Sequence, residues 1–162
     1  MAPYSTRYKF SQRFNVPARE AYSWCTDFQP EDVSLMGMKG RRSIRHISEN
    51  AVVLADRIYR DGSSFSKRRL VLLYPERLSW INTHLAGPNK HSQFLYEIIP
   101  EGKKASHLDF TGFQISYDIA GSATPEKIES LAKKLRDEDS DTWKRFARVM
   151  ERDIKKNPGR WR

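Results

Sequence analysis

The sequence predicts an α+β fold in which a curved antiparallel sheet of seven strands holds a long C-terminal helix on its concave face. Three observations lead to this prediction. Short segments alternate between apolar and polar residues, and turn residues separate them. The end of the chain carries an apolar stripe at helical spacing. The 162 residues are enough for one domain with one sizeable core, so we expect residues 1–162 to form a single domain.

The first strand is predicted over residues 8–16, where apolar side chains fall on every second position. Gln12 is the polar exception on that face. Pro17 ends the strand and suits the first turn of a helix over residues 18–26. A second short helical turn is predicted over residues 31–35. The apolar face of the strand consists of Tyr8, Phe10, Phe14 and Val16.

Six further strands follow, and the turns between them are short. Asp61-Gly62 is typical of a tight hairpin turn. Strands joined in this way form an antiparallel meander. The predicted strands cover residues 41–47, 51–59, 65–74, 78–85, 92–99 and 105–117.

The terminal helix is predicted over residues 124–156, with Thr124 as N-cap and Pro125 as the first helical residue. Four acids and a serine at 137–141 interrupt its apolar stripe, which indicates a bend or an opening there. We expect the basic tail, residues 157–162, to be frayed. The stripe consists of Ile128, Leu131, Leu135, Thr142, Phe146, Val149, Met150 and Ile154.

Composition excludes several classes of protein. The aromatic content of 12% is too high for a disordered chain. No apolar run approaches the ~18 residues that cross a bilayer. The first residues carry no hydrophobic segment, so a secretory signal is not expected. The only cysteine, Cys25, cannot form an internal disulfide, and we therefore expect a cytoplasmic protein.

The order of elements resembles the START/SRPBCC helix-grip superfamily of START domains, pollen-allergen-type ligand carriers and polyketide cyclases. Residues 14–22, FNVPAREAY, followed by Asp27 and Phe28, are similar to the family's passage from first strand to first helix, with the proline one place early. The resemblance implies a cavity between the sheet and the terminal helix that binds lipids, sterols, polyketides or hormones. Its motifs describe packing rather than chemistry, and such folds carry unrelated functions.

Alternation in the last two strands predicts which side chains line this cavity. Gln114 and Gly112 continue the inward face of the last strand, and Leu131 and Leu135 approach it from the helix. Tyr59 is a further polar tip that could reach the cavity. The inward face of these strands consists of Phe94, Tyr96, Ile98, Leu108 and Phe110.

The strand over residues 78–85 is ambiguous. Trp80, Asn82 and His84 share one face, of the mixed aromatic and polar kind that orients a ligand in a pocket. In the other interpretation, Asn82 and His84 face water while the opposite face packs inward, and this is the slightly favoured alternative.

Positive charge concentrates between residues 39 and 69 of a chain whose formal net charge is +9. Arg41 and Arg45 share a face of one predicted strand, and Lys67 and Arg69 share a face of another. The favoured interpretation is a solvated outer face of the sheet. The alternative is a platform for the phosphate groups of nucleic acid or of an anionic membrane surface. No RNA-recognition signature accompanies these basic strands.

The sequence contains no metal-ligand spacing, phosphate loop or nucleophile elbow, so we expect no metal and no cofactor and assign no catalytic residue. The first hypothesis is a carrier for an apolar or amphipathic small molecule. The second is a cyclase or dehydratase that uses His84, Asn82 and Tyr96 for proton transfer. The third is an anion-binding surface protein. An apolar pocket favours the first, and a histidine meeting a tyrosine or an acid inside the pocket favours the second.

Overall fold

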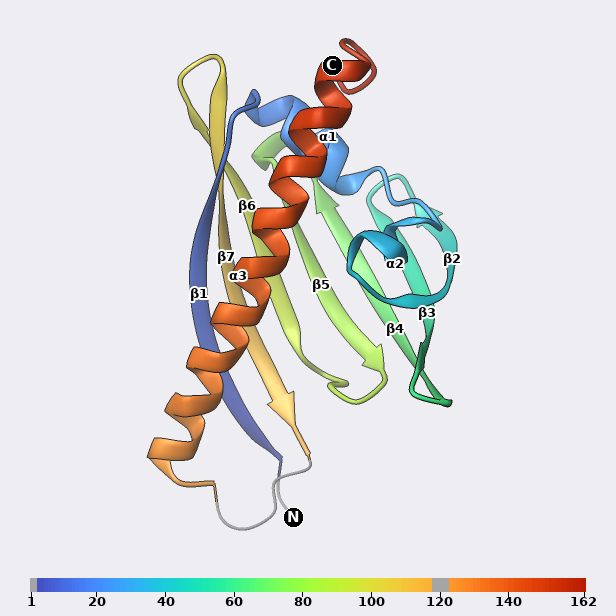
Figure 1. The fold of residues 1–162 in the computed structure, drawn as a ribbon, viewed down its shortest axis with the longest axis vertical. Coiled ribbons are helices and arrows are strands. Elements are labelled where there is room, and N and C mark those ends of the chain that lie inside the picture. The colour runs from blue at the N-terminus through green and yellow to red at the C-terminus, as the bar shows by residue number, and fades with distance from the viewer. Residues whose placement is uncertain (1–2, 118–122) are drawn as a thin grey trace.

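The computed structural model describes residues 3–117 and 123–162. It consists of a seven-stranded antiparallel sheet, two short helices and a long terminal helix, as the sequence predicts (Figure 1). The strand order is β1-β7-β6-β5-β4-β3-β2. The elements are β1 (Tyr4–Phe14), α1 (Ala18–Thr26), α2 (Asp32–Leu35), β2 (Lys39–Ser48), β3 (Ala51–Arg60), β4 (Ser63–Tyr74), a short 3-10 turn (Pro75–Arg77), β5 (Ser79–Ala86), β6 (Gln93–Glu101), β7 (Ala105–Ser116) and α3 (Pro125–Lys156).

The sheet is a meander that the first strand closes on one side. β2 to β7 pair with their neighbours in chain order, and β1 pairs with β7, with Phe10 opposite Phe110. The β3–β4 hairpin turns at Asp61 and Gly62, whose φ angles of 47° and 77° are both positive. A tight hairpin turn of this kind requires two positive φ angles, which explains why the Asp-Gly pair predicts it.

The long helix α3 crosses the concave face of the sheet diagonally (Figure 1). Thr124 caps it by accepting a hydrogen bond from the backbone N–H of Lys127, at 3.3 Å, and Pro125 is the first helical residue, as predicted. The helix is continuous through residues 137–141, so the expected bend is absent there. Its buried residues, Ala147, Met150 and Ile154, all lie toward its C-terminal end.

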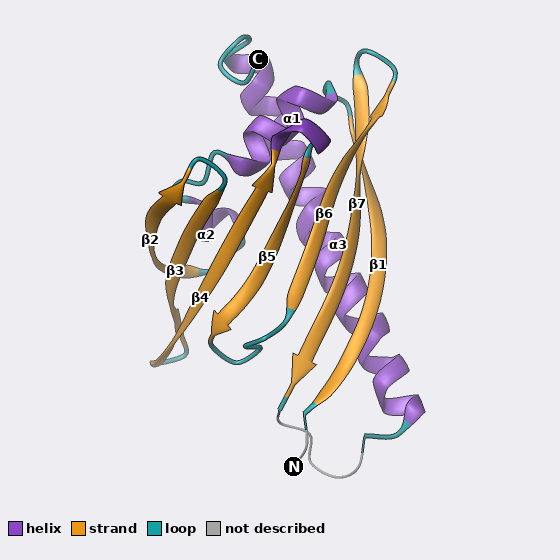
Figure 2. Cartoon of the chain, turned by 180° about the vertical axis from the view of Figure 1, so that it is seen from behind, coloured by secondary structure: helices purple, strands orange, loops and turns teal. Residues whose placement is uncertain are grey.

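The main core lies where this end of α3 meets α1 and the centre of the sheet. Phe14, Leu108 and Met150 are fully buried in it. A smaller cluster of Tyr8, Phe94 and Phe110 lies under the N-terminal part of α3. The helices all cover one face of the sheet, and in the described chain the opposite face is open to solvent (Figure 2). None of the described helices is long and apolar enough to span a bilayer.

The C-terminal tail is packed, and the expectation of a frayed end is wrong. Trp161 is only 8% exposed and belongs to the main core. Its indole N–H donates to Oδ2 of Asp27 at 3.3 Å. Burial of an indole with its N–H satisfied anchors the last residues beside α1.

Candidate functional site

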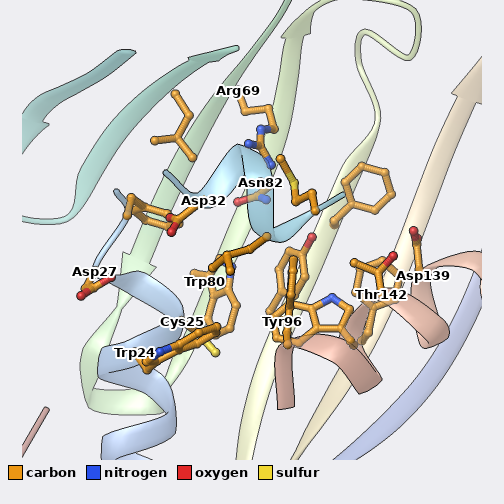
Figure 3. A pocket seen from close by; sticks show the side chains of 18 of the residues that line it. Trp24, Cys25, Asp27, Asp32, Arg69, Trp80, Asn82, Tyr96, Asp139 and Thr142 are labelled. Atoms are coloured by element: carbon orange, nitrogen blue, oxygen red, sulfur yellow. The ribbon is translucent and has the colours of Figure 1, made fainter. Parts of the chain in front are cut away.

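A cavity of about 540 Å³ lies between the concave face of the sheet and the helices α2 and α3. Figure 3 shows its wall from close by, with side chains from the sheet, from α1 and from α3 turned toward the same space. Its volume falls within the ~300–1,000 Å³ range of small-molecule sites in proteins. Its wall is not uniform: one part is aromatic and another carries charge.

The aromatic part of the wall comes from β5, β6, β7 and α3. Trp80 and Tyr96 stack, with ring centroids 4.8 Å apart and ring planes 3° apart. Trp143 of α3 packs against both of these rings, and Tyr96 also makes an edge-to-face contact with Phe110. Side chains at alternate positions of neighbouring strands point to one face, which explains why Trp80, Tyr96 and Phe110 lie side by side. The wall offers flat apolar surfaces of the kind that a planar ligand body can contact.

The charged part of the wall is centred on Asp56 of β3, whose side chain is fully buried. Arg42 of β2 donates to both of its oxygens, at 2.7 and 3.0 Å, and Arg69 of β4 donates to Oδ2 at 3.0 Å. Burial alone would raise the pKa of Asp56, but the Arg42 and Arg69 guanidinium groups outweigh it and hold that pKa below its usual value. Asp32 of α2 also pairs with Arg42, at 3.4 Å, and so ties α2 to the sheet.

Lys67 lies beside this cluster and lines the cavity. Its Cα is directly opposite that of Asp56 in the β3–β4 register. Within the described residues, no carboxylate lies in salt-bridge range of its amine. Burial, together with the positive charge of Arg69, lowers the pKa of Lys67 to about 8.

Asn82 and His84 of β5 complete this side of the cavity, and both are 5% exposed. His84 Nδ1 lies 2.9 Å from the Asn89 side-chain oxygen. Burial and then the charges of Arg69 and Lys67 lower the pKa of His84 to about 4, so its ring is neutral at pH 7. In the part of the chain that the structure describes, Nε of Arg69 and Oδ1 of Asn82 are buried without a hydrogen-bond partner. Figure 3 shows these two side chains next to each other.

A hydroxyl–carboxyl pair lies across the cavity from the basic residues. The Tyr8 hydroxyl of β1 donates to Oδ2 of Asp139 on α3, at 2.5 Å. Burial raises the pKa of Asp139, and the hydrogen bond from Tyr8 partly opposes this rise. Burial and the neighbouring carboxylate raise the pKa of Tyr8 far above its usual value. Asp139 therefore keeps its proton to a higher pH than an exposed aspartate does.

Two indole hydrogen bonds hold the α1 side of the cavity to the end of the chain. Trp24 of α1 donates to Oδ2 of Asp153 on α3, at 3.0 Å, and Trp161 donates to Asp27. All four of these residues line the cavity. Cys25 also lines it, and burial raises the pKa of its thiol well above the usual value. A thiol in this protonated state is a poor nucleophile.

No protein-family model matches the chain, and no curated protein matches it in sequence. Solved structures do match it over nearly its whole length. An aromatase/cyclase from a Streptomyces species has a TM-score of 0.74 at 12% identity, covering 93% of this chain and 96% of that one. Norcoclaurine synthase from Thalictrum flavum, in complex with dopamine and hydroxybenzaldehyde, has a TM-score of 0.67 at 9% identity, covering 98% and 91%. A START superfamily protein from Mycobacterium smegmatis has a TM-score of 0.64 at 13% identity, covering 93% and 97%.

The chain has the helix-grip fold that these solved structures share. At identities this low the likeness establishes the fold, and the chemistry of the site has to be argued from this chain's own residues.

Eight of the thirteen residues predicted for the helix-grip cavity surround it, and Asn82 and His84 are among them. The interpretation in which these two face water is therefore wrong, since both are buried on the concave side. The eight are Trp80, Asn82, His84, Phe94, Tyr96, Phe110, Gln114 and Leu135.

The other five predicted residues do not line the cavity. Tyr59 is 44% exposed, because odd-numbered residues of β3 face outward. Ile98 and Leu108 are buried in the main core. Gly112 lies behind Tyr8: a Cβ at Gly112 would be 2.8 Å from the Tyr8 ring. Leu131 is half-buried one turn before Leu135, outside the cavity wall.

The predicted basic surface is divided between the two faces of the sheet. Arg41 and Arg45 are exposed on the outer face, as expected. Lys67 and Arg69 line the cavity, so their assignment to the outer face is wrong. They share the parity of Val71, which is fully buried, and this signal in the sequence could have placed them inward. Arg42, Tyr8 and Asp139 are site residues that the sequence reasoning did not identify.

Proposed function

We propose that this protein binds an amphipathic small molecule with a planar apolar body and an oxygen-bearing polar group. The observation that carries the proposal is the division of one cavity into an aromatic wall and a basic wall. Trp80, Tyr96 and Trp143 would contact the body of the ligand. Arg69 and Lys67 would face its oxygen.

Because of its basic wall, the cavity suits a wholly apolar ligand less well than an amphipathic one. Buried cations are costly unless a partner satisfies them. Asp56 and Asp32 supply two negative charges to the cluster, whereas Arg42, Arg69 and Lys67 supply three positive ones. A carbonyl or carboxylate oxygen in the cavity would accept hydrogen bonds that no protein group now accepts. The norcoclaurine synthase structure, with its aromatic amine and aromatic aldehyde, supports ligands of this size for a helix-grip cavity.

The test is fluorescence titration with N-phenyl-1-naphthylamine, which is uncharged, and with 1-anilinonaphthalene-8-sulfonate, which carries an anionic group. We expect both probes to bind, and the anionic one to bind more tightly. Thr142 lines the cavity from α3, so Thr142→Phe should fill part of it and weaken both probes about tenfold. Ser130→Phe on an exposed part of the same helix is the matched control and should change neither. No binding of either probe to the folded wild type would contradict the proposal.

A second candidate is an enzyme that transfers protons to or from a bound carbonyl compound. His84 does not meet Tyr96 in the way that the cyclase hypothesis expects, because its ring nitrogen faces Asn89. The Tyr8–Asp139 pair favours this candidate instead, since a raised pKa makes a carboxylate a stronger base than an exposed aspartate. Exchange of the α-protons of 2-tetralone with D2O would support it if Asp139→Asn abolishes the exchange and leaves probe binding intact.

A further inference from the structure

The base of the Lys67 side chain is closely packed, whereas its amine has no partner among the described residues. It projects from the inward face of β4 and lines the cavity. The chain after β5 packs closely on its base: a Cβ at Gly87 would lie 2.8 Å from the Lys67 Cβ. Among the described residues, the amine has no hydrogen-bond or ion-pair partner. A cavity lysine in this setting calls for a physical explanation, because buried amines are normally paired.

The explanation lies in how Asp56 is used. Asp56 is the cross-strand neighbour of Lys67 and the acid best placed to pair with it. Its two oxygens already accept three N–H groups, two from Arg42 and one from Arg69. A guanidinium forms planar, two-pronged hydrogen bonds to a carboxylate that an ammonium cannot match. Lys67 is therefore left as the surplus cation of the cluster.

A half-buried surplus cation such as Lys67 can lose its charge by losing its proton. Every nearby group bears on this equilibrium. Arg69 and Arg42 disfavour the ammonium form, and Asp56 and, from the opposite wall, Asp139 favour it; His84 is neutral. With a pKa of about 8, roughly half of the Lys67 side chains are neutral amines at pH 8, whereas an ordinary lysine is almost fully protonated. The neutral amine is the nucleophilic form.

We propose that Lys67 forms an imine with an aldehyde or ketone held in the cavity. This inference rests on the proposed function and names the oxygen-bearing group of the ligand as a carbonyl. The aromatic wall would hold the ligand body, and Arg69 would face the carbonyl oxygen. Asp139 and Tyr8 lie across the same space as groups that can exchange a proton.

The chemistry balances without any oxidant or reductant. The lone pair of the neutral amine attacks the carbonyl carbon, and the π pair of the C=O bond moves to oxygen, which takes up a proton. The nitrogen loses a proton, giving a carbinolamine. Asp139, when it holds a proton, protonates the hydroxyl group, which leaves as water as the nitrogen lone pair forms the C=N bond. The iminium formed in this way then returns a proton to Asp139 and becomes the neutral imine. Amine and carbonyl thus give imine and one water.

The experiment traps the imine with 2-naphthaldehyde and sodium cyanoborohydride, which reduces the C=N bond to a stable secondary amine. Peptide mapping by mass spectrometry then locates the naphthylmethyl group. In wild type we expect Lys67 to be labelled at least tenfold faster than any other lysine, with a rate that rises with pH around a midpoint near 8. Asp139→Asn should slow the labelling without weakening binding of the aldehyde. Labelling spread evenly over exposed lysines, or confined to the α-amino group of the chain, would overturn the inference.

Two variants remove the reactive amine, and a third variant is the matched control. Lys67→Arg keeps the charge and cannot form the imine, and Lys67→Met serves if the arginine does not fit. Lys103→Arg changes an exposed lysine in the β6–β7 turn and should behave as wild type. Quenching of tryptophan fluorescence by 2-naphthaldehyde measures binding separately. Quenching without labelling of Lys67 contradicts the imine alone, and absence of quenching in wild type contradicts the proposed function as well.

Discussion

At the scale of single residues, the site depends on how three cationic side chains are arranged around the Asp56 carboxylate. Taking charged groups out of water is costly, and a buried ion pair is tolerated only where hydrogen bonds satisfy it fully. Asp56 meets this condition, because three N–H groups converge on its two oxygens. The same arrangement leaves Lys67 without an acid partner, and burial, followed by the positive charge of Arg69, lowers the pKa of Lys67.

Removing the charge of Asp56 should be among the most damaging substitutions in the protein. Asp56→Asn leaves Arg69 without a carboxylate partner and Arg42 with Asp32 alone, and we expect it to lower the free energy of unfolding by about 3–5 kcal/mol. Urea unfolding followed by circular dichroism measures this loss. Asp141→Asn, on an exposed acid of α3, is the matched control and should stay within ~0.5 kcal/mol of wild type.

The pH dependence of this difference has a definite sign. The pKa of Asp56 is lower in the folded protein than in the unfolded chain. Its contribution is therefore fully present above the unfolded value of about 3.9 and is lost as the pH falls through the folded value. The gap between wild type and Asp56→Asn should accordingly narrow below about pH 4. A gap that stays constant down to pH 2 would show that folding does not lower the pKa of Asp56.

Sequence reasoning identified the site residues whose position follows from strand alternation. It missed those whose position depends on contacts with residues far away in the sequence. Parity along β6 and β7 is enough to place Phe94, Tyr96 and Phe110 on one face. No local pattern could show that Asp139 meets Tyr8, because the two lie 131 positions apart and on different elements. For Lys67 the two signals disagree. Its place in the strand alternation indicated the concave side, whereas its charge favoured a solvent-exposed position.

At the scale of elements, the two parts of α3 have different roles. Its C-terminal part is buried at Ala147, Met150 and Ile154 and holds the sheet. Its middle part is half-buried and turns Leu135, Asp139 and Thr142 toward the cavity. Of the four acids that interrupt the apolar stripe at 137–141, Asp139 lines the cavity, whereas Asp137, Glu138 and Asp141 are exposed. The sequence indicated an opening at the right place, and the helix remains unbroken.

Two truncations on α3 should separate these roles. Met150 is fully buried, so Met150→Ala should cost about 2–5 kcal/mol of unfolding free energy. Leu135→Ala should cost only about 1 kcal/mol, since the leucine is half-buried against the cavity. Leu135→Ala should weaken the binding of N-phenyl-1-naphthylamine more than Met150→Ala does. Equal losses of stability in the two variants would contradict the division of the helix.

At the scale of the whole molecule, the fold was predictable because local and global signals agree. Turn residues, strand alternation and the helix cap each point to the same order of elements. What the order alone does not determine is which face of each strand is buried, since a shift of one residue reverses every side chain. The consequence here is a sheet with basic residues on both faces. The concave set belongs to the cavity, and the convex set, with Arg41, Arg45, Arg57 and Arg68, is open to solvent.

The last prediction concerns that convex set. Arg41 lies directly opposite Arg57 across the β2–β3 ladder, and like charges in such a pair are destabilising. The Arg41→Glu/Arg45→Glu double variant should therefore keep the free energy of unfolding within ~0.5 kcal/mol of wild type, with any change toward higher stability. Probe binding should be unchanged, because the cavity lies on the other face of the sheet.

The same variant decides whether the convex face docks onto phosphate groups. We expect weak binding of wild type to phosphatidylserine vesicles at low salt and none at physiological salt, where the Debye length is about 8 Å. Lys133→Glu/Arg136→Glu makes the same change of charge on the exposed side of α3 and should lower the low-salt binding equally. Binding that persists at physiological salt and disappears only in Arg41→Glu/Arg45→Glu would mean that the convex face is a specific docking surface. In that event two separate functions would occupy the two faces of the sheet, because the groups that bind phosphate and those that line the cavity share no side chain.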